Sequence, residues 1–371
     1  MKPVFFITIL FVYLLAHIYV GIRIFQLVPA VWFLRAIVVL VITLGFSSLI
    51  FYFTLNDKMN IRMVGFFYTF GTSWMIAFLY LFLLVFFMDI FRIINYFAHL
   101  VSKETIAVIF HNNGVTSFIA LGLVAFILII GNFRYHNKKR SHITIQTDKI
   151  DAAMRIVGIS DLHLGHTIKK KELSKWIEMI NVEKPDIVLI AGDLIDNDIR
   201  ALHHYSLDED LQRLNAPLGV YASTGNHEYI SGIKNSVAFF EKSGITLLRD
   251  SVAEINGLSI IGRDDYTHRH RKSLQHLAQN IDRETFSILL DHQPRHLDEA
   301  VENGIDFQFS GHTHRGQIFP FSLLVEKMFE LSHGYLKKGD THFYVSTGLG
   351  IWGGKFRIGT RSEYLVLDLV N

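Results

Sequence analysis

Four long apolar runs in the first 133 residues limit what this chain can fold into more than any other feature. A helix needs roughly 20 apolar residues to cross a bilayer, and each run reaches or nearly reaches that length. Because such runs lack a polar face, a buried bundle of a soluble protein is disfavoured. We therefore predict an all-α transmembrane region at residues 1–133, with four helices at about 4–22, 36–55, 64–88 and 115–133.

Lysine and arginine residues beside these runs predict the orientation of the region, because cytoplasmic flanks carry an excess of them. One side holds seven, namely Lys2, Lys58, Arg62, Arg134, Lys138, Lys139 and Arg140, and the other holds four, namely Arg23, Arg35, Arg92 and Lys103. With four spans both termini share a side, so we predict a multi-pass protein of the inner (cell) membrane whose C-terminal part faces the cytoplasm. Residues 91–103 are expected to lie on the membrane surface as an amphipathic segment.

The rest of the chain has the composition of an ordinary globular domain. Only seven Lys/Arg and three Asp/Glu precede residue 134, and the remaining 29 and 31 follow. We expect a basic linker and a first strand at 134–150 and one domain at 151–371. Its nearly neutral charge argues against a nucleic-acid partner. The chain has no cysteine, which excludes disulfides, zinc-thiolate sites and thiol nucleophiles.

Short apolar runs alternate with helical patterns in this domain. Strands are expected at 155–160, 186–191, 219–223, 258–262, 286–290, 307–310 and 342–346, because buried strands are usually continuous apolar runs. Helices are expected at 170–181, 231–242, 271–279 and 294–303. This alternation predicts an α/β fold, with a sheet core covered by helices.

Side chains that can bind metal follow five of the predicted strands. Loops beyond the strand ends of an α/β sheet converge on one place, so these side chains are expected to meet. Each short segment alone would be an ordinary turn, but five in a row favour a metal site. The predicted ligands are three oxygens, from Asp161, Asp193 and Asn226, and four nitrogens, from His163, His292, His312 and His314.

Seven ligands exceed the needs of one catalytic ion, which takes three or four protein ligands and keeps positions for water. We therefore predict two divalent ions that share a carboxylate. Mixed imidazole and carboxylate ligands suit Mn, Fe or Zn rather than Ca or Mg. Two such ions roughly 4 Å apart can clamp a phosphoryl group and generate hydroxide from water. This chemistry is hydrolysis of a phosphoester without a covalent nucleophile.

These residues resemble the calcineurin-like metallophosphoesterase superfamily, and in particular its membrane-associated bacterial subgroup. The superfamily pattern DxH, GDxxD, GNH(D/E), H and GHxH is matched in order, and the resemblance covers about 157–368. The segment from Ser346 to Gly350 and the stretch from Gly353 to Gly359 also resemble that subgroup. The resemblance implies a four-layer fold, with two mixed sheets packed face to face and helices outside.

The resemblance also implies a role for each residue. One ion would be held by Asp161, His163, Asp193 and His314, and Asp193 would bridge to a second ion held by Asn226, His292 and His312. His227 would approach the leaving-group oxygen as an acid or a phosphate contact, so His227 and Asp193 are the expected catalytic residues. The implied activity is that of a hydrolase of phosphodiester or diphosphate bonds.

Weaker candidates surround this set. Asp196 and Glu228 are expected to support the ligands from behind rather than to bind metal. Arg263 and Arg315 could grip a phosphate or could be plain surface arginines. Loop histidines such as His166 are expected to be solvated.

A membrane anchor beside a phosphoesterase favours a phosphoester substrate that is lipid-linked, such as a nucleotide-lipid diphosphate, although a generic phosphodiester is equally consistent. The membrane helices would contact lipids. The alternative is a non-enzymatic membrane-bound scaffold or sensor that uses the same fold, but such a protein would be expected to have lost ligands. No oligomeric state, metal identity or substrate follows from the sequence.

Overall fold

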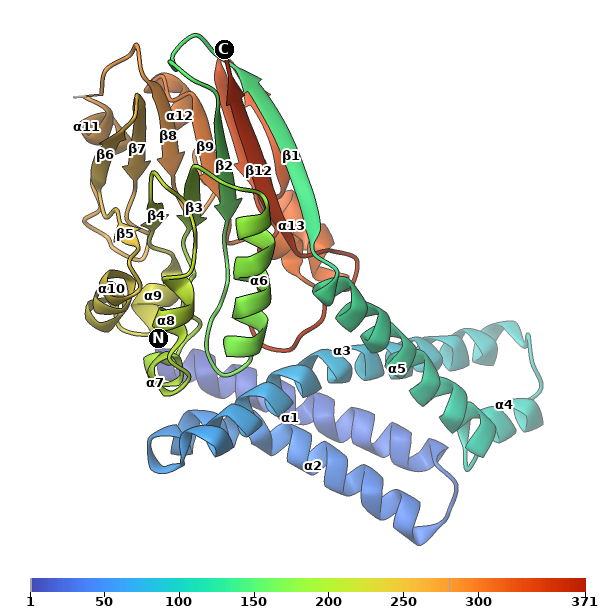
Figure 1. Ribbon diagram of the computed structural model, residues 1–371. Coiled ribbons are helices and arrows are strands. Elements are labelled where there is room, and N and C mark those ends of the chain that lie inside the picture. Colours follow the sequence, from blue (N-terminus) through green and yellow to red (C-terminus); the bar gives the residue numbers. More distant parts are fainter. Residues whose placement is uncertain (1, 280) are drawn as a thin grey trace. The chain divides into compact units, whose positions relative to one another are not determined.

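The computed structural model describes residues 2–279 and 281–371, and the chain divides into two compact units, one up to Ile130 and one over Gly131–Asn371. The first unit is entirely helical, as the ribbon in Figure 1 shows. Its elements are α1 (Lys2–Leu27), α2 (Trp32–Leu55), the 3-10 turn η1 (Asn56–Lys58), α3 (Ile61–Ala98), α4 (Lys103–Phe110) and most of α5 (Gly114–His136).

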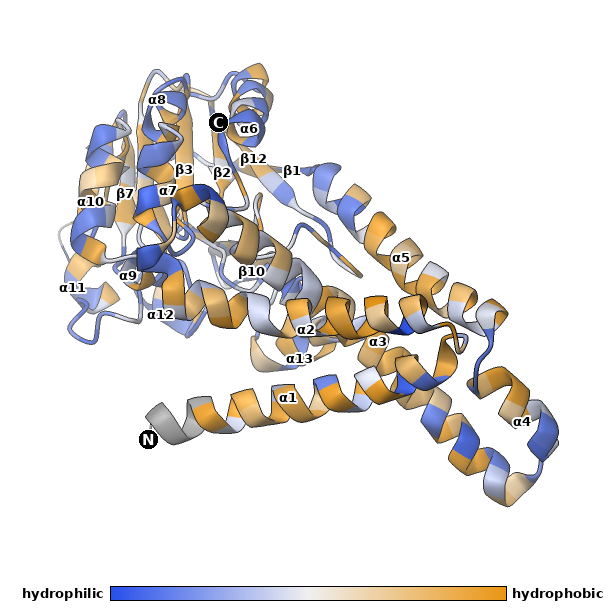
Figure 2. Ribbon diagram, turned by 90° about the horizontal axis from the view of Figure 1, so that it is seen from below, coloured by the Kyte–Doolittle hydropathy of each residue, from blue (hydrophilic) through white to orange (hydrophobic). Residues whose placement is uncertain are grey.

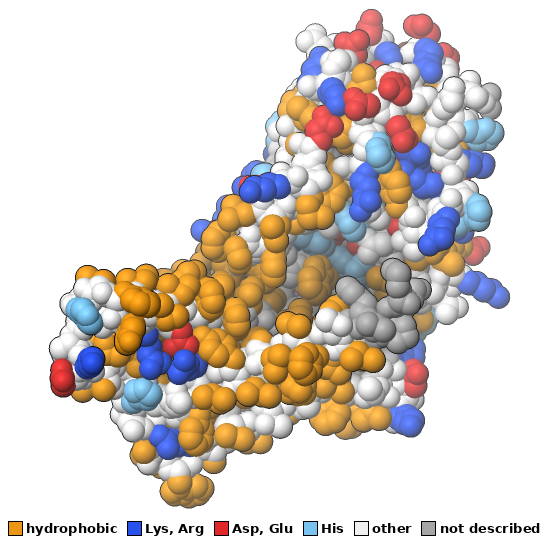
Figure 3. Space-filling view, turned by 180° about the vertical axis from the view of Figure 1, so that it is seen from behind, with side chains coloured by type: hydrophobic (Ala, Val, Ile, Leu, Met, Phe, Trp, Pro, Cys, Tyr) orange, Lys and Arg blue, Asp and Glu red, His pale blue; other side chains and the backbone are white. Residues whose placement is uncertain are grey.

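Four of these helices are long and apolar enough to cross a membrane, which confirms the predicted number. They are α1, α2, α3 and α5, and Figure 2 shows how consistently apolar they are. Apolar side chains also crowd the surface of this helical unit (Figure 3), as expected where lipid replaces water.

Helix α3 extends beyond residue 88, near which the third span is expected to end. Helix α3 continues without a break to Ala98, and a separate helix, α4, begins only at Lys103. Asp89, just after that expected end, binds Arg23 on α1 at 2.8 Å and Arg92 one turn further along α3 at 3.3 Å. Because these ion pairs satisfy the charges within the helix pair, α3 does not have to stop where its charged residues begin.

The second unit contains all the strands of the described chain. The strands are β1 (Lys139–Gln146), β2 (Met154–Ile159), β3 (Ile187–Ala191), β4 (Val220–Ser223), β5 (Thr246–Leu247), β6 (Ser251–Ile255), β7 (Leu258–Gly262), β8 (Phe286–Leu290), β9 (Phe307–Ser310), β10 (Gly334–Lys338), β11 (Thr341–Val345) and β12 (Glu363–Val370). The helices are α6 (Lys170–Val182), α7 (Ile199–His204), α8 (Leu207–Leu211), α9 (Asn226–Ile230), α10 (Ile233–Lys242), α11 (Leu274–Ala278), α12 (Asp298–Glu302) and α13 (Phe321–Met328), with the 3-10 turn η2 (His314–Gly316).

The strands form two mixed sheets of six, which confirms the predicted fold class. The first sheet has the order β1-β12-β2-β3-β4-β5, and the second has the order β10-β11-β9-β8-β7-β6. In the first sheet β2 to β5 run parallel and β12 runs antiparallel to β2. In the second sheet β7, β8, β9 and β11 run parallel. The carboxyl ends of the parallel strands in each sheet therefore lie along one edge.

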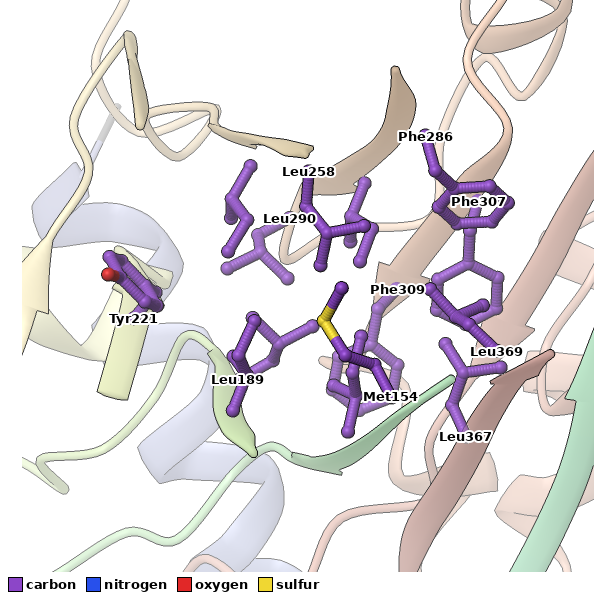
Figure 4. Close-up of a cluster of buried hydrophobic side chains, with 14 of the residues drawn as sticks. Met154, Leu189, Tyr221, Leu258, Phe286, Leu290, Phe307, Phe309, Leu367 and Leu369 are labelled. Atoms are coloured by element: carbon purple, nitrogen blue, oxygen red, sulfur yellow. The ribbon is translucent and has the colours of Figure 1, made fainter. Parts of the chain in front are cut away.

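The core lies between the two sheets (Figure 4). Met154, Leu189 and Leu367 of the first sheet and Leu290 and Phe309 of the second belong to one buried cluster. A side chain at Gly158 would come within 2.9 Å of the Phe309 ring, so glycine lets this ring pack directly on β2. This dry, close-packed base gives the loops at the strand ends a rigid support.

Candidate metal centre

The candidate ligands come from loops that follow strands of both sheets. The loops after β2, β3 and β4 supply Asp161, His163, Asp193 and Asn226, and the loops after β8 and β9 supply His292, His312 and His314. All except His312 are buried or, for Asn226, have a buried ligand atom. His312 is partly exposed, so the site has an opening to solvent.

Asp161, His163 and His314 form the first ligand group, with atoms that lie within 4.8 Å of one another. The Nε2 atoms of His163 and His314 are 3.1 Å apart, and the Nε2 of His314 is 3.5 Å from Oδ1 of Asp161. Three ligand atoms that face one another at such distances are arranged as for a common cation.

Asp193, His292 and His312 form the second group, which is equally compact. Oδ2 of Asp193 lies 3.1 Å from Nε2 of His292 and 3.8 Å from Nε2 of His163 in the first group. Asp193 therefore stands between the two groups. Its Oδ1 also accepts a hydrogen bond from the backbone N–H of His227 at 2.9 Å.

Unpaired atoms at the site fit the presence of metal. Asn226 Oδ1 and His292 Nε2 are buried and have no hydrogen-bond partner among the described residues. The Nδ1–H of His292 donates to the carbonyl of Ala191 at 2.8 Å, so in a neutral ring Nε2 carries a lone pair. That lone pair faces the Asp193 carboxylate, and only a cation or a proton between them makes this arrangement favourable.

When no cation lies between His292 and Asp193, a proton on His292 takes its place. Burial opposes a charged His292, but Asp193 outweighs burial, and the pKa of His292 lies well above its usual value. Burial likewise opposes ionisation of Asp193, yet His292, His227 and His163 hold the pKa of Asp193 well below its usual range. For His312, burial and the neighbouring His292 lower the pKa to about 4, which keeps this ring neutral and able to act as a ligand.

The backbone at the site adopts conformations that side chains rarely favour. Asp161, His163, Asp193, His312 and His314 all have φ between 47° and 69°. Such left-handed residues cost free energy unless the surrounding structure enforces them. They turn consecutive side chains sharply, so that both histidines of the Gly311–His314 loop reach the centre.

Two glycines allow the central carboxylates to lie directly against the backbone of neighbouring loops. A side chain at Gly225 would lie 2.2 Å from Oδ1 of Asp193, and one at Gly311 would lie 2.3 Å from Oδ2 of Asp161. Each carboxylate therefore packs directly on a bare backbone. These glycines are part of the GNH and GHxH segments for this steric reason.

Glu228 supports the site without facing the ligand groups. Its fully buried carboxyl accepts hydrogen bonds from the backbone N–H groups of Asp193 (3.0 Å), Ile195 (3.1 Å) and Gly225 (2.6 Å). Burial, with Asp193 nearby, raises the pKa of Glu228 to about 7. Glu228 thus connects the loop after β3 to the loop after β4.

His227 and Asp196 lie beside the first ligand group. The Nδ1–H of His227 donates to the backbone carbonyl of Asp196 at 2.5 Å, and Oδ1 of Asp196 lies 3.5 Å from Nδ1 of both His227 and His163. Burial would lower the pKa of His227, but the carboxylates of Asp193 and Asp196 outweigh it and raise that pKa. The His227 side chain is 20% exposed, so one edge of this ring is accessible from the opening.

The two arginines of the candidate list are bound to protein carboxylates. Arg263 is buried and pairs with Asp291 at 3.3 Å and Glu299 at 2.6 Å. Arg315 is partly exposed and pairs with Glu326 at 2.9 Å. His166, expected to be solvated, is instead fully buried and binds Asp198, the residue before α7, at 2.9 Å.

Arg357 is a functional-site residue that motif reading misses. It is completely buried and donates to the backbone carbonyls of His314 (2.9 Å), Thr347 (2.6 Å) and Gly350 (2.8 Å). Burial lowers its pKa to about 10. Arg357 thus fixes the backbone of a candidate ligand, and the only sequence signal is an arginine inside a glycine-rich stretch.

Comparison with known proteins agrees with this geometry. A family model described as calcineurin-like phosphoesterase matches residues 154–316. An uncharacterized metallophosphoesterase of Aquifex aeolicus is 30% identical over 236 residues, 61% of this chain and 89% of the relative. A transmembrane protein with metallophosphoesterase domain of Danio rerio is 29% identical over 304 residues, 76% of this chain and 69% of the relative.

An uncharacterized metallophosphoesterase of Helicobacter pylori strain J99 is 34% identical over 272 residues, which cover 69% of this chain and 72% of the relative. At that identity and coverage the two proteins share a family and not only a fold. The chain belongs to the calcineurin-like metallophosphoesterases.

Proposed function

We propose that this protein is a membrane-anchored, dinuclear metal-dependent phosphoesterase of the phosphodiesterase or pyrophosphatase type. The position of Asp193 carries the proposal, because its Oδ2 lies 3.1 Å from a histidine of one ligand group and 3.8 Å from a histidine of the other. A carboxylate between two groups of ligands is the arrangement that a pair of ions requires.

In this proposal Asp161, His163 and His314 hold one divalent ion, Asn226, His292 and His312 hold the other, and Asp193 binds both. The bound ions, which suit Mn, Fe or Zn, would supply positive charge for a phosphoryl group and lower the pKa of water. Glu228 and Arg357 hold the loops of these ligands in position. Asp196 orients His163 and His227.

His227 is proposed to donate a proton to the leaving group. The carboxylates of Asp193 and Asp196 raise its pKa and so favour the charged ring, and its Nδ1–H already donates to the Asp196 carbonyl. Nε2–H is therefore the proton that can be donated to a departing oxygen. The partial exposure of this ring agrees with contact to a substrate.

The proposed substrate is a phosphoester carried by a membrane lipid, such as a nucleotide-lipid diphosphate. The four apolar helices support this, because they hold the domain beside the bilayer where such esters are concentrated. We further propose that the domain faces the cytoplasm, on the side that carries more lysine and arginine.

The test uses the full-length chain in lipid nanodiscs, stripped with a chelator and reloaded with Mn, Fe or Zn in turn. Asp193→Asn should bind fewer ions than the parent and should lower hydrolysis of an aryl phosphodiester by at least about 100-fold. Asp340→Asn, an exposed carboxylate in the turn between β10 and β11, is the matched control and should change neither. If metal bound normally but no phosphodiester, monoester or lipid diphosphate were cleaved, the protein would be a non-enzymatic scaffold or sensor.

A further inference from the structure

An exposed apolar rim lies directly beside the candidate metal centre. It consists of Phe319, Phe321, Leu323, Leu324 and Met328, on and just before α13, and Trp352, and their exposed fractions run from 40% to 72%. Large apolar side chains so exposed on one short helix are unusual on a surface that faces only water. None of these side chains is a candidate metal ligand, so the metal centre does not explain their exposure.

The rim is attached to the metal-binding loop. The rings of His312 and Phe329, the residue that follows α13, are 6.4 Å apart, and Arg315 pairs with Glu326 of α13. The side-chain amide of Gln317 donates to the carbonyl of Trp352 at 3.1 Å. The rim therefore contacts the segment that carries His312 and His314.

The rim is also attached to the C-terminal end of α5, a candidate membrane-spanning helix. The carbonyl of Gly131 in α5 accepts a hydrogen bond from the N–H of Arg357 at 2.9 Å, and the Asn132 side chain donates to the carbonyl of Lys355 at 2.9 Å. The N–H of Phe319, the first residue of the rim, donates to the carbonyl of Ile358 at 2.7 Å. One segment, residues 355–358, thus binds α5 on one side and the rim on the other.

Close packing makes this connection rigid. A side chain at Gly131 would come within 2.7 Å of Ile358, so the segment lies directly on the helix. Tyr135 of α5 is fully buried and donates to Glu172 of α6, which also binds Lys355. The position of the rim is therefore fixed relative to the end of α5.

The end of α5 is the predicted edge of the bilayer. Helix α5 is a candidate span over Gly114–His136, Phe133 near its end is 66% exposed, and basic residues begin at Arg134. The change from exposed aromatic to basic side chains marks the boundary between acyl chains and headgroups. Lys327 and Arg361, both exposed, supply further cations for the headgroups beside the rim.

We propose that α13 and Trp352 form a membrane-inserted interfacial element, with the bilayer as the occupant of the apolar rim. The element brings the opening beside His312 to the headgroup layer. If the proposed hydrolysis is correct, the substrate class consists of phosphoesters anchored in that layer, reached without leaving the membrane. The insertion itself does not depend on hydrolysis.

The absence of cysteine allows a direct test in the full-length chain. Met328→Cys and, separately, Leu324→Cys are labelled with bimane and reconstituted in nanodiscs of phosphatidylcholine and phosphatidylglycerol. Val182→Cys is the matched control: Val182 is 78% exposed against 72% for Met328, and it lies near the start of β3, at the sheet edge opposite the ligands.

Lipids with a doxyl group in the acyl chain should reduce the fluorescence of the two rim labels at least about twofold, while aqueous iodide should quench only the control label. This readout needs no activity, so it separates insertion from hydrolysis. Iodide quenching of both rim labels, or protection of the rim labels from both quenchers, would overturn the proposal, since the rim would then face water or protein.

Discussion

Arg357 shows how a single side chain can hold a ligand loop in place. Its guanidinium satisfies several buried carbonyls that come together only in the folded protein, including that of His314. Arg357→Lys retains the charge but loses the planar fork of donors, so buried carbonyls lose partners. We expect the thermal midpoint of the domain to fall by roughly 5–10 °C, and metal retention by the first ligand group to weaken.

Differential scanning calorimetry and metal analysis of the full-length variant would check this. Arg361→Lys, the same change at an exposed position four residues later, should leave both quantities unchanged. An Arg357→Lys protein as stable and as metal-rich as the parent would mean that the carbonyls find other donors.

A second prediction at the residue scale concerns His227. If its ring donates a proton to the leaving group, His227→Gln should lower kcat by about 100-fold on a poor leaving group and much less on p-nitrophenolate, which needs no proton. The metal content should remain that of the parent, because the proposal makes His227 no ligand. An equal loss on both esters would assign His227 to phosphate binding instead.

The candidate ligands could be recognised from sequence because few residue types bind metal and each candidate follows a recognisable strand. Arg357 could not, because nothing local distinguishes a buried arginine from a surface one. Arg263 illustrates the same limit: its carboxylate partners lie 28 and 36 residues away, so its burial appears only in three dimensions.

At the scale of elements, one ionic cluster joins three strands. Asp368 on β12 accepts from His142 on β1 at 2.8 Å, and from Arg155 on β2 at 2.8 Å and 3.0 Å. These strands connect the end of α5 to the sheet that holds Asp161. Hydrogen bonds from Arg155, and then from His142, lower the pKa of Asp368 to about 2.

Because this pKa lies below the usual value of 3.8, the ionised carboxylate stabilises the fold above about pH 4, and the contribution is lost as the pH falls toward 2. Asp368→Asn should therefore lower the free energy of unfolding at pH 7 by about 1 kcal/mol, a value reduced by solvent access to the pair. Urea unfolding of parent and variant from pH 7 to pH 3 should show the difference shrinking. A difference that stayed constant with pH would assign it to packing rather than charge.

Elements were predictable where their pattern was continuous. The central strand β8 is apolar and fully buried, and the sequence predicts its bounds as observed. Strands β6 and β10 are partly exposed, and helices α7, α8 and α9 have only five or six residues, too few for a helical period to be recognised. Strand β12 is also a plain apolar run, although no strand is predicted there.

For the whole molecule, sequence predicts both halves but not how the second meets the membrane. Four apolar runs and a domain of alternating strands and helices follow from hydropathy and periodicity alone. The attachment of residues 355–358 to the end of α5 does not, because it joins segments more than 220 residues apart through hydrogen bonds to backbone carbonyls. Only that attachment relates the exposed rim on α13 to the membrane helices.

The last prediction is the side of the membrane on which the domain lies. Single cysteines in the cysteine-free chain at Asp57, Leu100 and Asp340 place a thiol in the turn after α2, in the turn after α3 and in the domain, and none of these changes removes a lysine or arginine. In right-side-out vesicles a membrane-impermeant maleimide should label Leu100→Cys at once, and Asp57→Cys and Asp340→Cys only after lysis, because the lysine- and arginine-rich side stays inside. Labelling of Asp57→Cys and Asp340→Cys in sealed vesicles, with Leu100→Cys protected, would put the domain outside the cell membrane and make envelope phosphoesters the substrates to test.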